Sequence, residues 1–183
     1  AGSGRGPGAA RAEGSTCSTI DRDAWVRALL ALFDEGFRGA AGGGTWYVDN
    51  DPKCGLLGTL AGLSAEAASR PLAPGDPLTA ASHADHVRFA LSLANRASRG
   101  ENPYPTADWA ASWAVRSVTE EEWAGLVAAL ESEIRDLRRF IETGKPLEEE
   151  MFATGIFGLV AHTAWHLGAL RQALGLIRAP AES

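Results

Sequence analysis

The stretch that decides the fold is residues 147–177, which read LEEEMFATGIFGLVAHTAWHLGALRQALGLI. Residues separated by alternating steps of three and four positions lie on the same side of an α-helix. The positions that share this seam are Phe152, Gly155, Leu159, His162, His166, Ala169 and Ala173. We therefore predict a long final helix from about Leu147 to Ile177, with two histidines on the face that lines the interior.

Three earlier segments also predict long helices. One is centred on residues 25–33, another runs over about 79–99, and the third begins at the capping box of residues 119–122. Residues 100–118 contain two prolines and two tryptophans, which is typical of a long connection, whereas residues 144–146 read Gly-Lys-Pro and predict a tight turn. We therefore predict an all-α fold, a four-helix bundle with a long crossover between helices 2 and 3.

The remaining segments predict the domain limits and a few short elements. Residues 1–18 are small, polar and rich in glycine, so we expect a flexible tail there, followed by the bundle domain over 19–178 and a short tail over 179–183. Residues 45–48, which read TWYV, predict an extended segment because they are aromatic and β-branched. Residues 56–68 predict one short helix.

Composition and charge argue against nucleic acid and membranes as partners of this chain. The chain has 183 residues, is 45% hydrophobic and carries a formal net charge of −6, without the basic stripe that nucleic acid would require. No apolar run reaches the roughly 18 residues that span a bilayer. The two cysteines, Cys17 and Cys54, form no CxxC motif. We expect a cytoplasmic protein that acts on a small molecule, without a nucleic-acid or membrane partner.

All four histidines lie on two of the predicted seams. His162 and His166 are four residues apart, and His83 and His86 are three apart, so each pair shares one helix face. Isolated histidines on apolar faces are usually hydrogen-bonded core residues, but two imidazoles buried without partners would cost free energy. Imidazole is a common ligand of divalent metal ions, and a third ring from a facing helix would complete a three-ligand site. The residues alone leave either His83 or His86 as that third ligand.

Residues 161–172, AHTAWHLGALRQ, resemble the last-helix motif of the DinB-like (damage-inducible, YfiT-like) superfamily. That motif has two histidines four residues apart, followed by a small residue and then Arg-Gln or a similar pair. In the family, the third metal-binding histidine stands in the second helix, seven residues after the Ser or Thr that opens it. Counting from Thr79 leads to His86, which is followed by an apolar Val87. The resemblance therefore implies His86, His162 and His166 as metal ligands, with His83 as the substitute.

This resemblance covers roughly residues 19–177 and implies a four-helix bundle that binds zinc, nickel or a similar divalent ion, often as a homodimer. Family members of known chemistry are mostly transferases that join a low-molecular-weight thiol, such as mycothiol or bacillithiol, to an electrophile. The metal would hold the thiol as the nucleophilic thiolate. We thus expect a metal-dependent thiol S-transferase with a thiol co-substrate. The alternatives are a metal-dependent hydrolase and a non-enzymatic bundle that binds a small molecule or metal.

Five other residues have both a structural and a functional interpretation. Trp165 lies between the two histidines but on another helix face, where we expect packing. Trp109 and Trp113 are four residues apart in the crossover and either pack or cap the site. Arg171 either binds an anionic group or forms a surface ion pair, and we favour the ion pair. For Cys54 we expect the role of a small apolar side chain.

Overall fold

The computed structural model describes residues 21–42 and 44–176, so the predicted tails at 1–18 and 179–183 lie outside the described residues. Within them the chain forms six α-helices joined by loops and short 3₁₀ turns. The helices are α1 (Arg22–Arg38), α2 (Leu56–Ala61), α3 (Ala65–Ala68), α4 (Ala80–Ser98), α5 (Glu120–Glu142) and α6 (Glu150–Ala173). This part of the chain contains no strand, only an isolated bridge between Pro71 and Thr79. The prediction of an all-α fold is confirmed.

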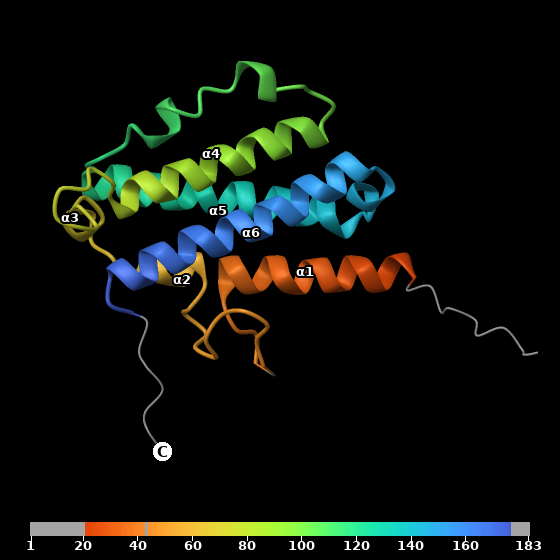
Figure 1. Cartoon of the computed structure of the whole chain (residues 1–183), viewed down its shortest axis with the longest axis horizontal. Helices are drawn as coiled ribbons and strands as arrows, with labels where there is room; N and C mark the ends of the chain where they lie inside the picture. Colours follow the sequence, from red (N-terminus) through yellow and green to blue (C-terminus); the bar gives the residue numbers. More distant parts are fainter. Residues whose placement is uncertain (1–20, 43, 177–183) are drawn as a thin grey trace, which may run out of the picture.

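The four long helices lie alongside one another, and the short α2 and α3 lie near one end of the set (Figure 1). Both α1 and α4 contact α5 and α6. The connection from α4 to α5, residues 99–119, runs back along the outer side of α4 and contains two 3₁₀ turns, Tyr104–Thr106 and Ala111–Trp113. This long connection, which the sequence predicted, brings its second turn against α4.

Side-chain caps begin three of the four long helices, α1, α4 and α5. The Asp21 carboxylate accepts a hydrogen bond from the backbone N–H of Ala24 at the start of α1. Thr79 and Thr119 both form full capping boxes, in which the side chains of Ser82 and Glu122 respectively accept a hydrogen bond from the backbone N–H of the cap residue. Each such cap stabilises its helix by about 1 kcal/mol. These caps fix where α4 begins, and therefore the axial position of the histidines that follow.

Large apolar side chains of α1 and α5 fill much of the core. They are Leu29, Phe33 and Phe37 on α1 and Leu130, Ile134, Leu137 and Ile141 on α5, and none is more than 1% exposed. Full burial of a side chain of this size contributes roughly 1.5–3 kcal/mol. This packing holds α5 in place, and α4 packs against α5 along its length.

The structure corrects the extended segment predicted at residues 45–48. Residues 46–48 form a series of bends, and their backbone N–H groups all donate to the Glu35 carboxylate, at 2.6 to 2.9 Å. Glu35 belongs to α1 and is only 6% exposed. Because a buried carboxylate needs hydrogen-bond donors, the segment curls around it instead of extending.

Two predicted helix boundaries also differ from the structure. The single helix expected over 56–68 is interrupted, because Ser64 caps a new helix at Ala65. The final helix begins at Glu150 instead of about Leu147, since residues 145–148 form a 3₁₀ turn. That turn follows Gly144, whose φ of +70° lies in the left-handed region that favours glycine.

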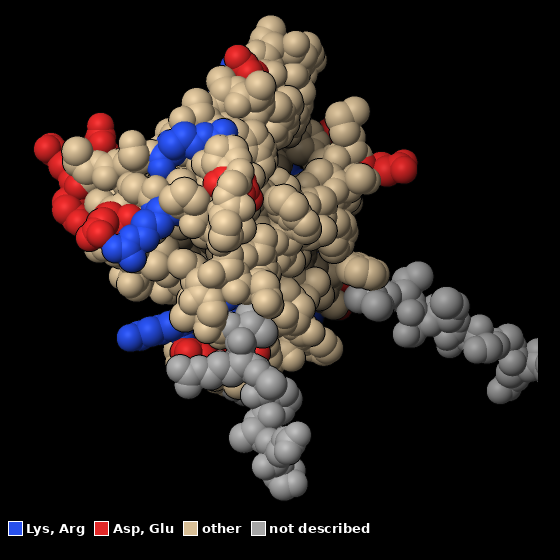
Figure 2. Space-filling view, turned by 60° about the vertical axis from the view of Figure 1, so that its left-hand side comes forward, with Lys and Arg blue, Asp and Glu red and all other residues tan. Residues whose placement is uncertain are grey.

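The surface seen in Figure 2 is mostly uncharged. Its Lys and Arg side chains form no continuous basic patch on this face and lie close to Asp and Glu at several points. Among the described residues, no helix has both the length and the apolar character needed to cross a membrane.

Candidate metal centre

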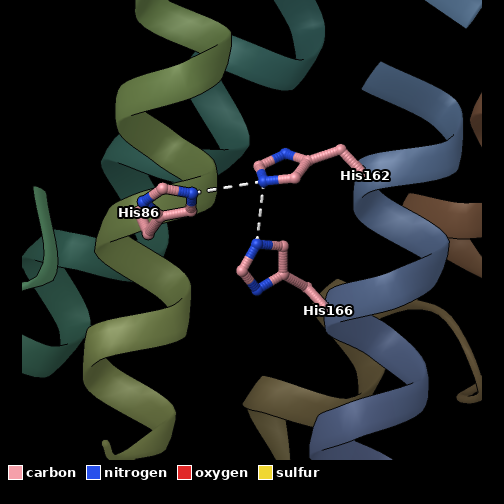
Figure 3. Close-up of side chains that lie close together, drawn as sticks. All are labelled: His86, His162 and His166. Carbon is pink, nitrogen blue, oxygen red and sulfur yellow. Dashed lines mark hydrogen bonds between the residues drawn. The ribbon is translucent and has the colours of Figure 1, made fainter. Parts of the chain in front are cut away.

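Three histidines from two helices direct their rings at one point (Figure 3). His86 comes from α4, and His162 and His166 come from successive turns of α6. The Nε2 atom of His162 lies 3.2 Å from Nε2 of His86 and 2.9 Å from Nε2 of His166. His166 is completely buried and His86 is 6% exposed. Residues 76 positions apart in sequence thus present converging nitrogen atoms.

This arrangement fits a divalent metal ion. One nitrogen from each of the three rings lies within 4.8 Å of the other two. A tetrahedral ion at 2.0–2.1 Å from its imidazole ligands requires ligand nitrogens about 3.4 Å apart, so small ring movements would suffice. Among the residues that the structure describes, no other group of histidine, cysteine and carboxylate side chains meets the same criterion. The three histidines could therefore hold a metal ion.

Hydrogen bonds on the far side of two rings favour the tautomer that a metal requires. The Ser112 hydroxyl donates to the carbonyl of Trp109 at 2.7 Å and lies 2.7 Å from Nδ1 of His86. Since its proton is engaged, the hydroxyl oxygen accepts from Nδ1–H, which leaves the Nε2 lone pair of His86 directed at the cluster. A hydrogen bond of this kind orients a metal-binding imidazole and raises its basicity.

His83 plays the corresponding part for His166. Their two Nδ1 atoms lie 2.8 Å apart, so His83 reaches the side of the His166 ring that faces away from the cluster. If Nδ1 of His166 donates in this bond, its Nε2 lone pair is free for a metal. The structure therefore places His86 within the converging set and His83 behind the His166 ring.

The four imidazoles have depressed pKa values. Burial, reinforced by the neighbouring histidines, lowers the pKa of His86 to about 4 and that of His166 to about 2. Burial also lowers the pKa of His162 and of His83, the latter partly opposed by Asp76. The rings are consequently neutral near pH 7, and neutral imidazole is the form that binds metal.

Tryptophans surround the cluster on its outer side. Trp113 stacks on His86, with 4.0 Å between ring centroids and 20° between planes, and it meets His83 edge-on at 5.3 Å. Trp109 lies 5.9 Å from the His86 ring. Both residues predicted to pack or to cap the site therefore contact a histidine of the cluster. Trp165 also contacts His166, at 4.7 Å, but is 61% exposed, so the expected packing role is only partly realised.

The other residues singled out in the sequence do not enter the cluster. Arg171 forms an ion pair with Asp49 at 2.9 Å, as favoured above. Cys54 is buried and its thiol donates to the carbonyl of Asp49. Ser112 was not predicted, because a single serine between two tryptophans of a long connection carries no distinguishing pattern.

Comparisons of the chain with protein-family models, with curated proteins and with solved structures found no match.

Proposed function

We propose that this chain is a metal-dependent enzyme of the DinB-like type, a four-helix bundle that acts as a thiol S-transferase. The observation that carries the proposal is the convergence of three neutral imidazoles, from His86, His162 and His166, next to a cavity. The ion expected is zinc or nickel. The last-helix motif, with its histidines four residues apart, supports the family, and His86 is the ligand that the resemblance implies on α4.

The protein residues would bind the ion and keep its environment dry. Three imidazoles leave at least one position for a substrate atom, as in catalytic zinc sites. Ser112 bonds to Nδ1 of His86, and His83 bonds to Nδ1 of His166. These bonds would hold the two rings in the orientation that a metal requires. Trp113 covers the His86 ring and limits access of water. A bound divalent ion would lower the pKa of a thiol from about 8.5, so that the thiolate predominates at neutral pH.

A hydrolase and a thiol transferase would place different demands on the residues around the ion. Metal-dependent hydrolases commonly use a carboxylate as general base towards the attacking water. Among the described residues, no carboxylate belongs to the histidine cluster. Thiol transfer would need no such base, because a bound ion would favour loss of the thiol proton to solvent. The sulfur then forms a bond to the electrophilic carbon, and the leaving group departs with the bonding electron pair.

The decisive experiment is elemental analysis of protein purified without a polyhistidine tag and supplied with zinc or nickel. We expect about one equivalent of metal per chain and, for the loaded protein, metal-dependent conjugation of mycothiol, bacillithiol or cysteine to 1-chloro-2,4-dinitrobenzene. His166→Ala should lose both the metal and the conjugation while its helical circular dichroism persists. Protein that stays metal-free under these conditions contradicts the proposal. Metal binding without any turnover would indicate the non-enzymatic alternative.

A further inference from the structure

A cavity of about 600 Å³ adjoins the histidine cluster. It lies between α4, α6 and the connection that follows α4, and His162 forms part of its wall. Its size is within the range of pockets that bind small molecules. His162 is thus shared between the cavity and the candidate metal site.

Small residues on both facing helices create this cavity. Ala90, Ala94 and Ala97 of α4 follow one another at helical spacing, and Gly155 and Gly158 of α6 do the same, ending four residues before His162. A Cβ atom added at Gly155 or at Gly158 would meet no atom within 4 Å. Both glycines are exposed, so the open space beside them belongs to a cleft that reaches the surface and is not an unfilled position in the core.

Aromatic side chains form the other walls. Tyr104 and Trp109 of the connection, Phe140 of α5 and Phe152 of α6 line the cavity. Flat aromatic walls across from alanine and glycine suit a ligand that is itself planar and apolar.

The charged groups near the cavity argue against a charged ligand. Among the described residues, no Lys or Arg lines it, and the one carboxylate in its lining, that of Glu101, is already paired with Arg96 at 2.6 Å. Asn102 and the Tyr104 hydroxyl add neutral polar groups, with His162 at the metal side. Away from the metal end, a carboxylate or sulfonate would lose its hydration without gaining a cationic side chain among the described residues.

We infer that the cavity binds the electrophilic substrate, and that this substrate is an uncharged, largely aromatic molecule of about one or two rings. This inference rests on the proposed function, because it assigns the cavity to the partner of the thiol. With 1-chloro-2,4-dinitrobenzene as the substrate, the thiolate sulfur bonds to the ring carbon that carries chlorine. Chloride leaves with the bonding electron pair, and the thiol proton has passed to solvent.

The test fills the cavity by a substitution that the fold tolerates. Gly158→Leu adds a side chain where the structure has free space, and leucine is a better helix former than glycine by roughly 0.5–1 kcal/mol. Gly125→Leu is the matched control, since Gly125 lies within α5, also has nothing near its Cβ position and does not line the cavity. Both variants should retain the metal content and thermal stability of the parent protein.

The probe is N-phenyl-1-naphthylamine, an uncharged aromatic fluorophore, added to the zinc-loaded protein. We expect Gly158→Leu to weaken binding of the probe at least about tenfold, because the leucine side chain would take up space that the probe needs. Gly125→Leu should leave binding of the probe unchanged. The sulfonated analogue 8-anilinonaphthalene-1-sulfonate should bind at least about tenfold more weakly than the uncharged probe. In the conjugation assay, Gly158→Leu should raise the KM for 1-chloro-2,4-dinitrobenzene without changing that for the thiol.

The outcomes separate this inference from the proposed function. Equal binding of the probe by the parent and by Gly158→Leu, or a preference for the sulfonated probe, would overturn the cavity assignment even if the protein binds metal and conjugates thiols. Conversely, protein without metal refutes the proposed function, and the same probe measurement still shows whether the cavity takes an uncharged aromatic ligand. An unchanged KM in Gly158→Leu would show that the electrophile binds elsewhere.

Discussion

Two pairs of helices differ in the side chains that they turn towards each other. The side chains between α1 and α5 and those between α4 and α6 recur at the same helical spacing, but they are of different kinds. Between α1 and α5 the seams carry leucine, isoleucine and phenylalanine, all essentially inaccessible to solvent. Between α4 and α6 they carry alanine, glycine and histidine, which leave a cavity and a cluster of buried imidazoles. One half of the interior is thus filled with apolar groups, and the other retains polar groups and open space.

This difference shows how one set of helices can combine a stable core with a site. Burial of large apolar side chains is the main favourable contribution to folding, whereas burial of imidazoles carries a desolvation cost. The α1 and α5 contacts therefore provide stability that the cavity and the histidine cluster do not. In the second half, small residues and inward-facing nitrogens provide binding capacity instead.

The largest expected difference is in the free energy of unfolding, when leucine is replaced by alanine in each half of the interior. Leu137 of α5 is completely buried, so Leu137→Ala should lower the free energy of unfolding by roughly 2–5 kcal/mol. Leu159 of α6 is only partly buried and borders the cavity, so Leu159→Ala should cost about 1 kcal/mol, because fewer contacts are lost. Urea unfolding of the two metal-free variants measures the difference. Equal losses would contradict the proposed division of the interior.

A smaller effect is expected from the residues behind the metal ligands. Removal of a hydrogen-bond partner of a metal-binding imidazole typically lowers metal affinity by 10- to 100-fold, so His83→Ala and Ser112→Ala should each weaken zinc binding by roughly that factor. Competition with a chelator of known affinity gives the values. Ser92→Ala is a control, because Ser92 lies on α4 but bonds only to a helix carbonyl there. If His83→Ala abolished binding as completely as His166→Ala, His83 would itself be a ligand.

The sequence predicted most of the helical framework because its signals are local. Capping boxes, helical periodicity and a glycine turn act within a few residues, so Thr79, Thr119 and Gly144 could be placed from the sequence. The same holds for His162 and His166, since one helical turn brings them to the same face. These features required no knowledge of how the helices pack.

The remaining features depend on contacts between distant segments. His83 and His86 share one face of α4, and only the axial position of α4 against α6 decides which ring meets His162. The hydrogen bond from His86 to Ser112 likewise depends on the path of a long connection. The curled segment after α1 was missed because its partner, Glu35, is not adjacent in sequence. Periodicity carries no information about such pairings.

The segment that curls around Glu35 offers the finest test, because it lies against both halves of the molecule. The Tyr47 hydroxyl donates to the carbonyl of Leu32 on α1 at 2.6 Å, and Tyr47 also borders a shallow pocket with Leu167 of α6. Loss of this hydrogen bond in Tyr47→Phe should lower the free energy of unfolding by about 1 kcal/mol. Metal affinity should stay unchanged, since no histidine of the cluster contacts this hydroxyl in the described structure.

A second substitution isolates the same hydroxyl. A Cβ atom at Gly36 would lie only 2.3 Å from the Tyr47 hydroxyl oxygen, although alanine is otherwise favoured over glycine in a helix by roughly 0.5–1 kcal/mol. Gly36→Ala should therefore destabilise the parent protein, or leave it unimproved, but stabilise the Tyr47→Phe variant, in which the conflicting atom is absent. A double-mutant cycle in urea measures this coupling. Equal effects of Gly36→Ala in both backgrounds would mean that Tyr47 does not pack over α1 as described, and that the segment is held by the Glu35 carboxylate alone.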